Sequence, residues 1–413
     1  MAGDLLKVAL AYSGGLDTSV ILKLIQEKLD ADVVTITIDV GQKDDFEAIE
    51  KKALALGAVN HYTVNVQKEF VEHYLFKAIK ANALYQDQYP LATALARPLA
   101  VKEIVAIAKK EQVDSIAHGC TGKGNDQIRF DLGIKSLYPG IPILAPVREW
   151  NLAREWEMDY ARKMDIPVSD KIYSIDENLW GRSIEGGVLE QPFEEPPEDI
   201  FEWTLSVHDA PEAPQYITLD FEEGVPVALN GIPMDPVELI KTLNTLAGTH
   251  GIGRIDYIEN RCVGIKSREI YEAPAAVTVI TAHKDLENLI FTKWVHEFKS
   301  MVEAKWSWLT YNGLWFEPLR NALDAFIDNL ETLVSGTVKL KLHKGSATAV
   351  GRISDNSLYE KDLATFGEST FDQMQAVGFI ELFGLQSVLA YNKTSQSPEP
   401  PGDPLTEVET LYE

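Results

Sequence analysis

The residues with the clearest chemistry form a short turn near the start of the chain, Ser13-Gly-Gly-Leu-Asp-Thr-Ser19. An apolar run precedes this turn and a run with helical spacing follows it, so we expect a strand, a glycine turn and a helix in that order. The paired glycines let the backbone approach a ligand closely. The start of a helix directs free N–H groups and the positive end of its dipole at an anion. The turn therefore predicts a phosphate site, and the alternative is an ordinary turn in which Asp17, Thr18 or Ser19 caps the helix.

The same turn lacks the lysine that nucleotide triphosphatases place on the outer phosphates. No Gly-Lys-Ser/Thr closes it, so it is not a Walker A motif. It is not the G-x-G-x-x-G dinucleotide fingerprint either. Hydroxyl groups and backbone amides suit a pyrophosphate that is held and then released, which points away from transfer of a γ-phosphate.

A second glycine-rich loop, His118 to Phe130, follows another short apolar run. Asn125, Asp126 and Arg129 bring an amide, a carboxylate and a guanidinium close together. An amino acid carries both a carboxylate and an ammonium, so this set suits such a ligand. The alternative is a polar surface loop in which Asp126 caps a helix, and His118 alone is typical of a structural histidine.

The elements that position these loops alternate between strands and helices in the first third of the chain. We expect strands at residues 8–12, 33–38, 62–66, 115–117 and 141–144, and helices at residues 44–56, 68–84, 98–111 and 152–164. This alternation predicts an α/β fold with a doubly wound parallel sheet. Both loops begin at the carboxyl end of a strand, where ligands bind in such sheets.

The pattern changes after about residue 166. Residues 192–214 are rich in Pro, Glu and Asp and predict a long irregular segment. Hairpins are expected at residues 216–229 and 337–353, turning at Glu223-Gly224 and Lys344-Gly345, with helices at residues 236–247 and 286–304. These elements predict an α+β second domain. A late apolar stretch, residues 379–391, is expected to be a helix that packs either on another subunit or on its own chain.

Composition and charge restrict the class of protein. The chain has 413 residues, 45% of them hydrophobic, and a formal net charge of -25. Such a surface repels phosphate backbones, so we expect no nucleic-acid partner. Two cysteines far apart favour a reducing compartment. No signal peptide or membrane span is recognisable, so we expect a cytoplasmic protein that binds no membrane.

Four blocks of sequence resemble the argininosuccinate synthase family, a member of the N-type ATP pyrophosphatase group. They are Ala11-Tyr-Ser-Gly-Gly-Leu-Asp-Thr-Ser19, Tyr89 through Leu95-Ala-Arg-Pro98, His118 to Phe130, and Gly251-Ile-Gly-Arg-Ile-Asp-Tyr-Ile-Glu-Asn-Arg261 continuing to Tyr271. A shorter block, Ser174-Ile-Asp-Glu-Asn-Leu179 with Ser183, also fits. The first block marks only the wider group, whereas Gly122-Lys-Gly-Asn-Asp-Gln127 and Glu259-Asn-Arg261 are specific to the synthase.

The resemblance implies an ATP-dependent condensation of citrulline with aspartate in arginine biosynthesis, giving argininosuccinate, AMP and pyrophosphate. The citrulline ureido oxygen would attack the α-phosphate of ATP to form a citrullyl-adenylate, and the aspartate amine would then displace AMP. Mg²⁺ is implied with the ATP phosphates, and no metal ligated by protein side chains is expected. Asp17 would either orient that Mg²⁺ through water or cap the helix. Members of the family are homotetramers, so the same assembly is implied here.

Carried over by position, the resemblance implies a set of site residues for each substrate. The ATP site would comprise Ala11, Tyr12, Ser13, Gly14, Gly15, Leu16, Asp17, Thr18, Ser19, Ile38 and Gly119. The aspartate site would comprise Thr121, Asn125 and Asp126, with Asp17 and Asp126 taking the catalytic roles. The citrulline site would comprise Tyr89, Asn125, Arg129, Ser174, Ser183, Glu259 and Tyr271. Arg129 would pair with the citrulline carboxylate and Glu259 with its ammonium.

Each assignment has a structural alternative. Tyr89 and Tyr271 are alternatively core aromatics, Ser174 and Ser183 helix caps, and Glu259 and Arg261 a structural ion pair.

Two positions depart from the family pattern. Ala94 stands where many members have a serine that contacts citrulline, so Thr93 or a water would replace that hydrogen bond. Cys120 stands where alanine is common, which predicts either a thiol-sensitive loop or a small buried residue.

Two other functions fit parts of the chain. One is a tRNA-modifying ATP pyrophosphatase, which the acidic charge and the second loop disfavour. The other is an inactive nucleotide-binding scaffold, which the polar residues of both loops disfavour.

We expect four segments. Residues 1–167 would form the nucleotide-binding domain of the ATP-pyrophosphatase type, and residues 168–365 the synthetase and oligomerisation domain. Residues 366–394 would form a C-terminal arm between subunits, and residues 395–413 a disordered acidic tail.

Overall fold

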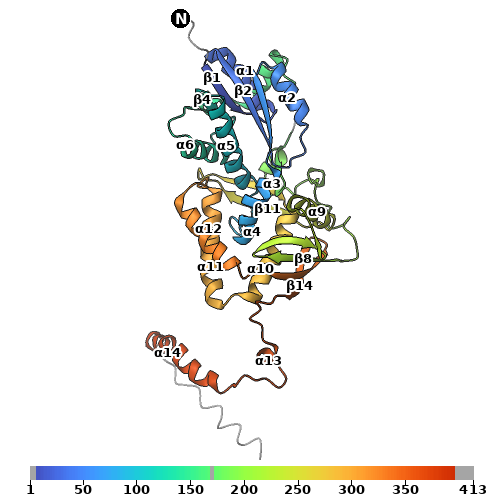
Figure 1. Ribbon diagram of the computed structural model, residues 1–413, viewed down its shortest axis with the longest axis vertical. Coiled ribbons are helices and arrows are strands. Elements are labelled where there is room, and N and C mark those ends of the chain that lie inside the picture. Colours follow the sequence, from blue (N-terminus) through green and yellow to red (C-terminus); the bar gives the residue numbers. More distant parts are fainter. Residues whose placement is uncertain (1–5, 168–171, 396–413) are drawn as a thin grey trace, which may run out of the picture. The chain divides into compact units, whose positions relative to one another are not determined.

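The computed structural model describes residues 6–167 and 172–395 (Figure 1). The chain forms two compact units, of which the first ends at Leu358 and the second begins at Tyr359. The predicted boundary after residue 167 lies inside the first unit and stays a prediction, as do the other domain limits. The predicted disordered tail falls outside the described residues, apart from Ser395.

A five-stranded parallel sheet lies at the centre of the N-terminal region. Its order is β3-β2-β1-β4-β5, made from β1 (Leu6–Ala11), β2 (Ala31–Asp39), β3 (Asn60–Asn65), β4 (Ser115–Ala117) and β5 (Ile143–Leu144). β1 pairs with both β2 and β4, so the strand order reverses beside it, and such a switch point opens a crevice at the carboxyl ends. The predicted doubly wound sheet is confirmed.

Helices cover both faces of this sheet, because alternate residues of β1 point to opposite sides. Val8 and Leu10 pack with α1 (Leu16–Leu29) and α8 (Arg154–Lys163). Ala9, on the other face, packs with α5 (Ala92–Lys110) and α6 (Asp126–Leu137). Two further helices flank the sheet ends, α2 (Phe46–Ala55) and α7 (Pro146–Glu149).

Three helix predictions need correction. The helix expected from residue 98 begins six residues earlier, at Ala92, and contains Pro98 in its interior. The helix expected at residues 286–304 is two helices, α10 (Pro274–Ile290) and α11 (Lys293–Tyr311), because Thr292 caps the second by accepting a bond from the N–H of Val295. The helix expected at residues 68–84 is α3 (Gln67–Phe70), a π-helical turn (Val71–Leu75) and α4 (Phe76–Lys80).

Two antiparallel sheets follow. One has the order β10-β9-β8-β13-β14 and contains both predicted hairpins. Its strands are β8 (Gln215–Glu222), β9 (Val225–Leu229), β10 (Ile232–Pro233), β13 (Gly336–His343) and β14 (Ser346–Ile353). All four turn residues have positive φ, at Glu223-Gly224 and Lys344-Gly345, as a two-residue hairpin turn requires. Both hairpin predictions are confirmed.

The other antiparallel sheet has the order β11-β12-β7-β6 and was not predicted. It consists of β6 (Ser174–Asn178), β7 (Gly181–Glu185), β11 (Arg254–Asn260) and β12 (Lys266–Glu272). The segment between β7 and β8 is irregular apart from two 3₁₀ turns, Gly187–Glu190 and Glu198–Ile200. A long irregular segment was expected here. The remaining helices of the first unit are α9 (Pro236–Thr249) and α12 (Pro318–Glu331).

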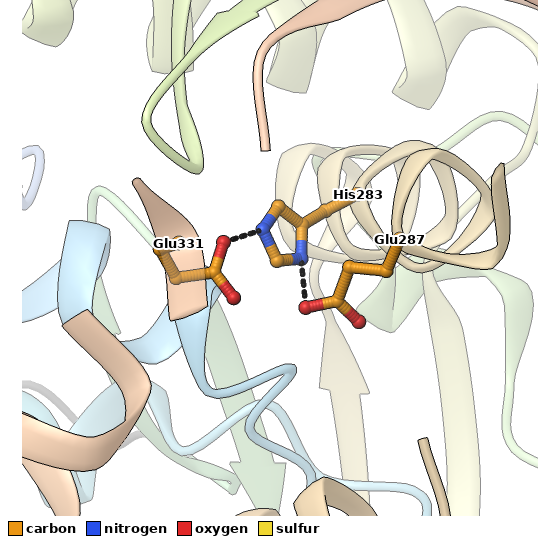
Figure 2. Close-up of side chains that lie close together, drawn as sticks. All are labelled: His283, Glu287 and Glu331. Atoms are coloured by element: carbon orange, nitrogen blue, oxygen red, sulfur yellow. Dashed lines mark hydrogen bonds and ion pairs between the residues drawn. The ribbon is translucent and has the colours of Figure 1, made fainter. Parts of the chain in front are cut away.

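A cluster of charged side chains is buried in the packing of α10, α11 and α12. Figure 2 shows His283 between Glu287 and Glu331, with His283 Nε2 2.9 Å from Glu331 Oε2. The ammonium of Lys299 lies 2.6 Å from Glu287 Oε1 and 3.3 Å from Glu331 Oε1. By spacing alone, His283, Glu287 and Glu331 could hold a metal ion. The ammonium of Lys299, however, already lies between the two carboxylates.

The second unit contains α13 (Lys361–Ala364) and α14 (Gln375–Thr394). The predicted C-terminal helix is therefore confirmed, and none of its side chains is buried. Within the described part of the chain, we find no helix with the length and hydropathy that crossing a membrane demands.

Candidate active site

A cleft of about 1180 Å³ opens at the carboxyl ends of the parallel strands and is also lined by the β11-β12-β7-β6 sheet. Of the predicted site residues, only Ser19 does not line it. The lining residues from the predicted sets are Ala11, Tyr12, Ser13, Gly14, Gly15, Leu16, Asp17, Thr18, Ile38, Tyr89, Gly119, Thr121, Asn125, Asp126, Arg129, Ser174, Ser183, Glu259 and Tyr271. The fold thus brings together residues that are up to 260 positions apart in the sequence.

The first loop has a backbone that only glycine adopts easily. Gly14 has a φ of +75°, and a Cβ on it would lie 2.9 Å from Ile49 Cγ1. Lys52 Nζ donates to the carbonyl of Gly14 over 2.7 Å and holds the loop against α2. Ser13 and Thr18 hydroxyls lie 3.2 Å apart at the cleft surface. The loop is therefore fixed in shape while its hydroxyl groups face the cleft.

The helix that follows this loop starts without a side-chain cap. Its N-cap is Gly15, in extended conformation, and no side chain accepts a bond there. The alternative in which Asp17, Thr18 or Ser19 caps the helix is therefore wrong. The N-terminal amides of α1 keep their donor capacity for an anion in the cleft.

Ser19 supports the loop from behind. Its side chain is fully buried, and its hydroxyl lies 3.2 Å from the Tyr12 hydroxyl.

Asp17 lies against a second carboxyl group. Its side chain contacts Glu157 of α8, which is buried and was not predicted as a site residue. Burial, and after it the charge of Asp17, together raise the pKa of Glu157 to about 8. Burial also raises the pKa of Asp17, against the opposing charge of Arg154. The two carboxyl groups therefore hold a proton between them near neutral pH.

The second loop ends in a network of ion pairs around Asp126. Arg97 Nε donates to Asp126 Oδ2 over 2.8 Å, and Arg129 Nη1 donates to Asp126 Oδ1 over 2.9 Å. Burial alone would raise the pKa of Asp126, but these two guanidinium groups outweigh it and the pKa falls below its usual value. Arg97 also pairs closely with Asp176 of β6. The N-cap of α6 is Asn125, so the alternative in which Asp126 caps this helix is wrong.

Arg129 and Asn125 join the second loop to the end of α11. Arg129 donates twice to the carbonyl of Tyr311, over 3.1 and 2.9 Å. The Asn125 amide donates to the Tyr311 hydroxyl over 2.8 Å and accepts from the backbone N–H of Cys262 over 2.8 Å. These bonds fix the position of both side chains at the cleft wall.

Glu259 is a buried carboxylate surrounded by phenol groups. It is only 2% exposed, and it accepts hydrogen bonds from Tyr271 over 2.6 Å, from Tyr257 over 2.8 Å, and from Tyr311 at closer range. Burial raises the pKa of all three tyrosines and the nearby carboxylate raises it further, so they stay protonated as donors.

Arg261, the alternative ion-pair partner predicted for Glu259, pairs with other carboxylates. Arg261 pairs with Glu185 and Glu269, so the structural pair of Arg261 with Glu259 is wrong. Among the residues that the structure describes, no ammonium or guanidinium group pairs with Glu259.

The remaining predicted residues lie beside Glu259. Tyr89 stacks on Tyr271 with ring centroids 4.2 Å apart, and its hydroxyl accepts from the N–H of Thr93 over 2.8 Å. Ser183 donates to the carbonyl of Asp176 over 3.3 Å from within β7, so it is not a helix cap. Ser174 begins β6. Thr93 lines the cleft whereas Ala94 is buried, so of these two neighbours Thr93 is the one that faces a ligand.

Cys120 also lines the cleft. Burial raises the pKa of its thiol, and the charge of Asp126 adds to this effect. The thiol is therefore held in its unreactive protonated form.

Sequence reasoning missed four residues of this cleft or its wall: Lys52, Arg97, Glu157 and Asp176. Two of them, Arg97 and Asp176, lie inside the blocks that carry the family resemblance. A charged side chain within such a block could have marked each as a site residue. The helical spacing of apolar residues suggests that Lys52 and Glu157 are exposed to solvent. No local feature of the sequence distinguishes them from surface charges.

Comparisons with known proteins found matches over most of the chain. The N-terminal HUP domain of arginosuccinate synthase matches residues 7–167, and the C-terminal domain of the same enzyme matches residues 173–390. An argininosuccinate synthase from Pyrococcus furiosus is 67% identical over 388 residues, which are 94% of this chain and 95% of the relative. Argininosuccinate synthases from Dehalococcoides mccartyi and Bacillus cytotoxicus are 56% and 51% identical, covering 93% and 94% of this chain and 95% and 98% of their own length.

Proposed function

The chain belongs to the argininosuccinate synthase family, and we propose that its cleft carries out both half-reactions of that enzyme with the residues described above. It is an ATP-dependent ligase of arginine biosynthesis that forms a C–N bond between citrulline and aspartate. The ureido oxygen of citrulline attacks the α-phosphorus of ATP, and the bond to the pyrophosphate oxygen breaks. The amine of aspartate then attacks the ureido carbon, loses a proton, and displaces AMP to give argininosuccinate.

The observation that carries this proposal is the unpaired charge of Glu259. A buried carboxylate with only neutral donors around it attracts a cation from the ligand. The α-ammonium of citrulline meets this need, with the stacked rings of Tyr89 and Tyr271 as the floor of its site. Arg129, which lines the same wall, takes the citrulline carboxylate.

The first loop holds the phosphates of ATP. The uncapped start of α1 supplies backbone N–H donors, and Ser13 and Thr18 supply hydroxyl groups. Asp17 offers a carboxylate oxygen beside them, which suits Mg²⁺ bound to the phosphates through water. When bound, this ion neutralises charge on the departing pyrophosphate. The protein accelerates the reaction mainly by positioning the reactants and stabilising their charge.

Thr121, Asn125 and Asp126 face the aspartate substrate on the opposite side of the adenylate. Asp126 stays ionised beside Arg97 and Arg129. Its charge orients the ammonium of aspartate and favours delivery of the amine to the ureido carbon.

The experiment that tests this function is exchange of labelled pyrophosphate into ATP. We expect exchange that depends on citrulline and needs no aspartate. Exchange with another acceptor, and none with citrulline, would refute the substrate while leaving adenylation in place.

We also propose that the protein is a homotetramer in which α14 packs on another copy of the chain. Its apolar side chains are exposed, among them Phe379, Leu382 and Phe383. Light scattering tests the assembly: the wild type is expected at four times the chain mass, and Phe383→Glu at a lower mass. A monomeric wild type would contradict the proposal.

The cytoplasm is the proposed location of the enzyme. Both cysteines, Cys120 and Cys262, are free thiols, which suits a reducing compartment. Cell fractionation tests this, and recovery with an extracytoplasmic fraction would refute it.

A further inference from the structure

Arg97 lies at the centre of the ion-pair network in the cleft. It extends from α5 and joins Asp126 at the start of α6 to Asp176 in β6. All three side chains line the cleft next to the proposed aspartate site.

The two carboxylates on Arg97 are held very differently. Asp126 has a second guanidinium partner, Arg129, whose side chain is only 4% exposed. Asp176 has Arg97 as its ion-pair partner within the described residues, and its side chain is 34% exposed. A partly hydrated ion pair contributes little net stability, so the pair of Arg97 with Asp176 is the part of the network that a ligand can exchange most easily.

The other guanidinium groups on this side of the cleft are committed. Arg182 is buried and pairs with Glu272 and Glu202. Arg261 pairs with Glu185 and Glu269. Arg129 is already assigned to the citrulline carboxylate. Arg97 is therefore the guanidinium that can offer its planar fork to a carboxylate entering from the cleft.

The aspartate substrate carries two carboxylates and one ammonium. The acidic groups at its proposed site provide for the ammonium, but the carboxylates need a cation. In the free protein the carboxylate of Asp176 lies on Arg97 in the way that a substrate carboxylate would.

We propose that Arg97 binds a carboxylate of the incoming aspartate, and that Asp176 is a stand-in for that carboxylate which the substrate displaces. This inference rests on the proposed function. It adds a binding residue for the second substrate and a competitor within the protein that must be displaced before the second half-reaction. Because Arg97 holds no group of ATP or citrulline in the proposed function, we expect its loss to affect the use of aspartate and to leave formation of the adenylate in place.

Three variants and two assays test the inference. Pyrophosphate exchange with ATP and citrulline measures the first half-reaction without aspartate, and the complete reaction gives the KM for aspartate. We expect Arg97→Gln to raise this KM at least tenfold while exchange stays within about threefold of wild type. Arg97→Lys keeps the charge and loses the fork, so we expect an intermediate KM. Asp176→Asn removes the competitor, so we expect a KM equal to or below that of wild type.

The matched control is Lys102→Gln, on the exposed side of the same helix, where Lys102 pairs with Glu69 and Glu103. It is expected to leave both assays unchanged. Retained exchange shows that each variant is folded. If Arg97 acts only by supporting Asp126, the aspartate KM of the double variant Arg97→Gln with Asp126→Asn equals that of Asp126→Asn alone, which overturns the proposal.

The assays also separate failure of the stand-in role from failure of the proposed function. A rise of the aspartate KM in Asp176→Asn contradicts the stand-in role. Wild-type protein with no citrulline-dependent exchange refutes the proposed function and this inference with it, whereas normal exchange with an unchanged aspartate KM in Arg97→Gln refutes the inference alone.

Discussion

At the scale of single residues, the chemistry of this cleft depends on which charges are paired inside the protein and which await a ligand. Asp126 is kept ionised by two guanidinium groups, Asp17 shares a proton with Glu157, and Glu259 has only neutral donors. Asp126, Asp17 and Glu259 could be predicted from the sequence as site residues. Their partners could not be, because Arg97, Glu157 and Tyr311 come from distant helices whose packing no local pattern specifies.

Asp126→Asn is predicted to impair the second half-reaction more than the first. The amide keeps the shape of the side chain but loses the charge that orients the aspartate ammonium. We expect the KM for aspartate to rise about tenfold or more, which corresponds to roughly 1.4 kcal/mol, with citrulline-dependent exchange much less affected. Equal losses in the two assays would refute the role of Asp126.

Glu157 is predicted to make stability fall as pH rises. Its pKa is raised to about 8 in the folded protein, mainly by burial, against about 4.3 when unfolded. Between these values the folded state binds the extra proton, so the free energy of unfolding decreases with rising pH by at most about 1.4 kcal/mol per unit. Glu157→Gln removes this term, so its stability relative to wild type should increase from pH 5 to pH 8.

Urea unfolding at several pH values measures this difference. Glu155→Gln is the control, because Glu155 is an exposed neighbour on α8 and should leave the pH profile unchanged. Parallel profiles for wild type and Glu157→Gln would show that Glu157 holds no extra proton.

At the scale of elements, strand–turn–helix units with strong local signals were predictable, and polar strands were not. The glycine turn after β1, with Gly14, and the hairpin turns at Gly224 and Gly345 need a positive φ that glycine adopts easily, so their residue types indicate the conformation. The β11-β12-β7-β6 sheet escaped prediction because its strands carry charged residues on the face that lines the cleft. Alternation of apolar and polar residues is lost where a sheet serves as a binding wall.

Gly14→Ala tests the element that binds phosphate. A Cβ there meets Ile49 and opposes a positive φ, so the loop must shift and ATP affinity should fall at least tenfold in a folded protein. Gly140→Ala is the matched control, because Gly140 also has a positive φ but has no atom within 4 Å of the added Cβ. Calorimetric titration with ATP measures both, and unchanged affinity in Gly14→Ala would remove the phosphate-loop interpretation.

At the scale of the whole molecule, an ionic cluster joins three consecutive helices, α10, α11 and α12; Figure 2 shows its His283, Glu287 and Glu331, and Lys299 completes it. Burial lowers the pKa of His283 to about 4 and raises that of Glu287 to about 7, so the buried charge is kept small around one ammonium. The sequence did not reveal this cluster, because each member reads as an ordinary polar residue on its own helix.

Lys299→Met is predicted to destabilise the protein by about 3–5 kcal/mol, because it leaves buried carboxylates without their cation. Lys305→Met is the control, since Lys305 is exposed on the same helix. Thermal unfolding compares the two variants, and an unchanged melting temperature in Lys299→Met would show that the cluster needs no ammonium.

The central claim is that the cleft joins the ureido oxygen of citrulline to the α-phosphate of ATP. The most direct measurement uses citrulline labelled with ¹⁸O in the ureido group, followed by mass spectrometry of the AMP and pyrophosphate formed with aspartate. The account predicts one ¹⁸O atom in AMP and none in pyrophosphate. Unlabelled AMP, or label in pyrophosphate, would contradict it.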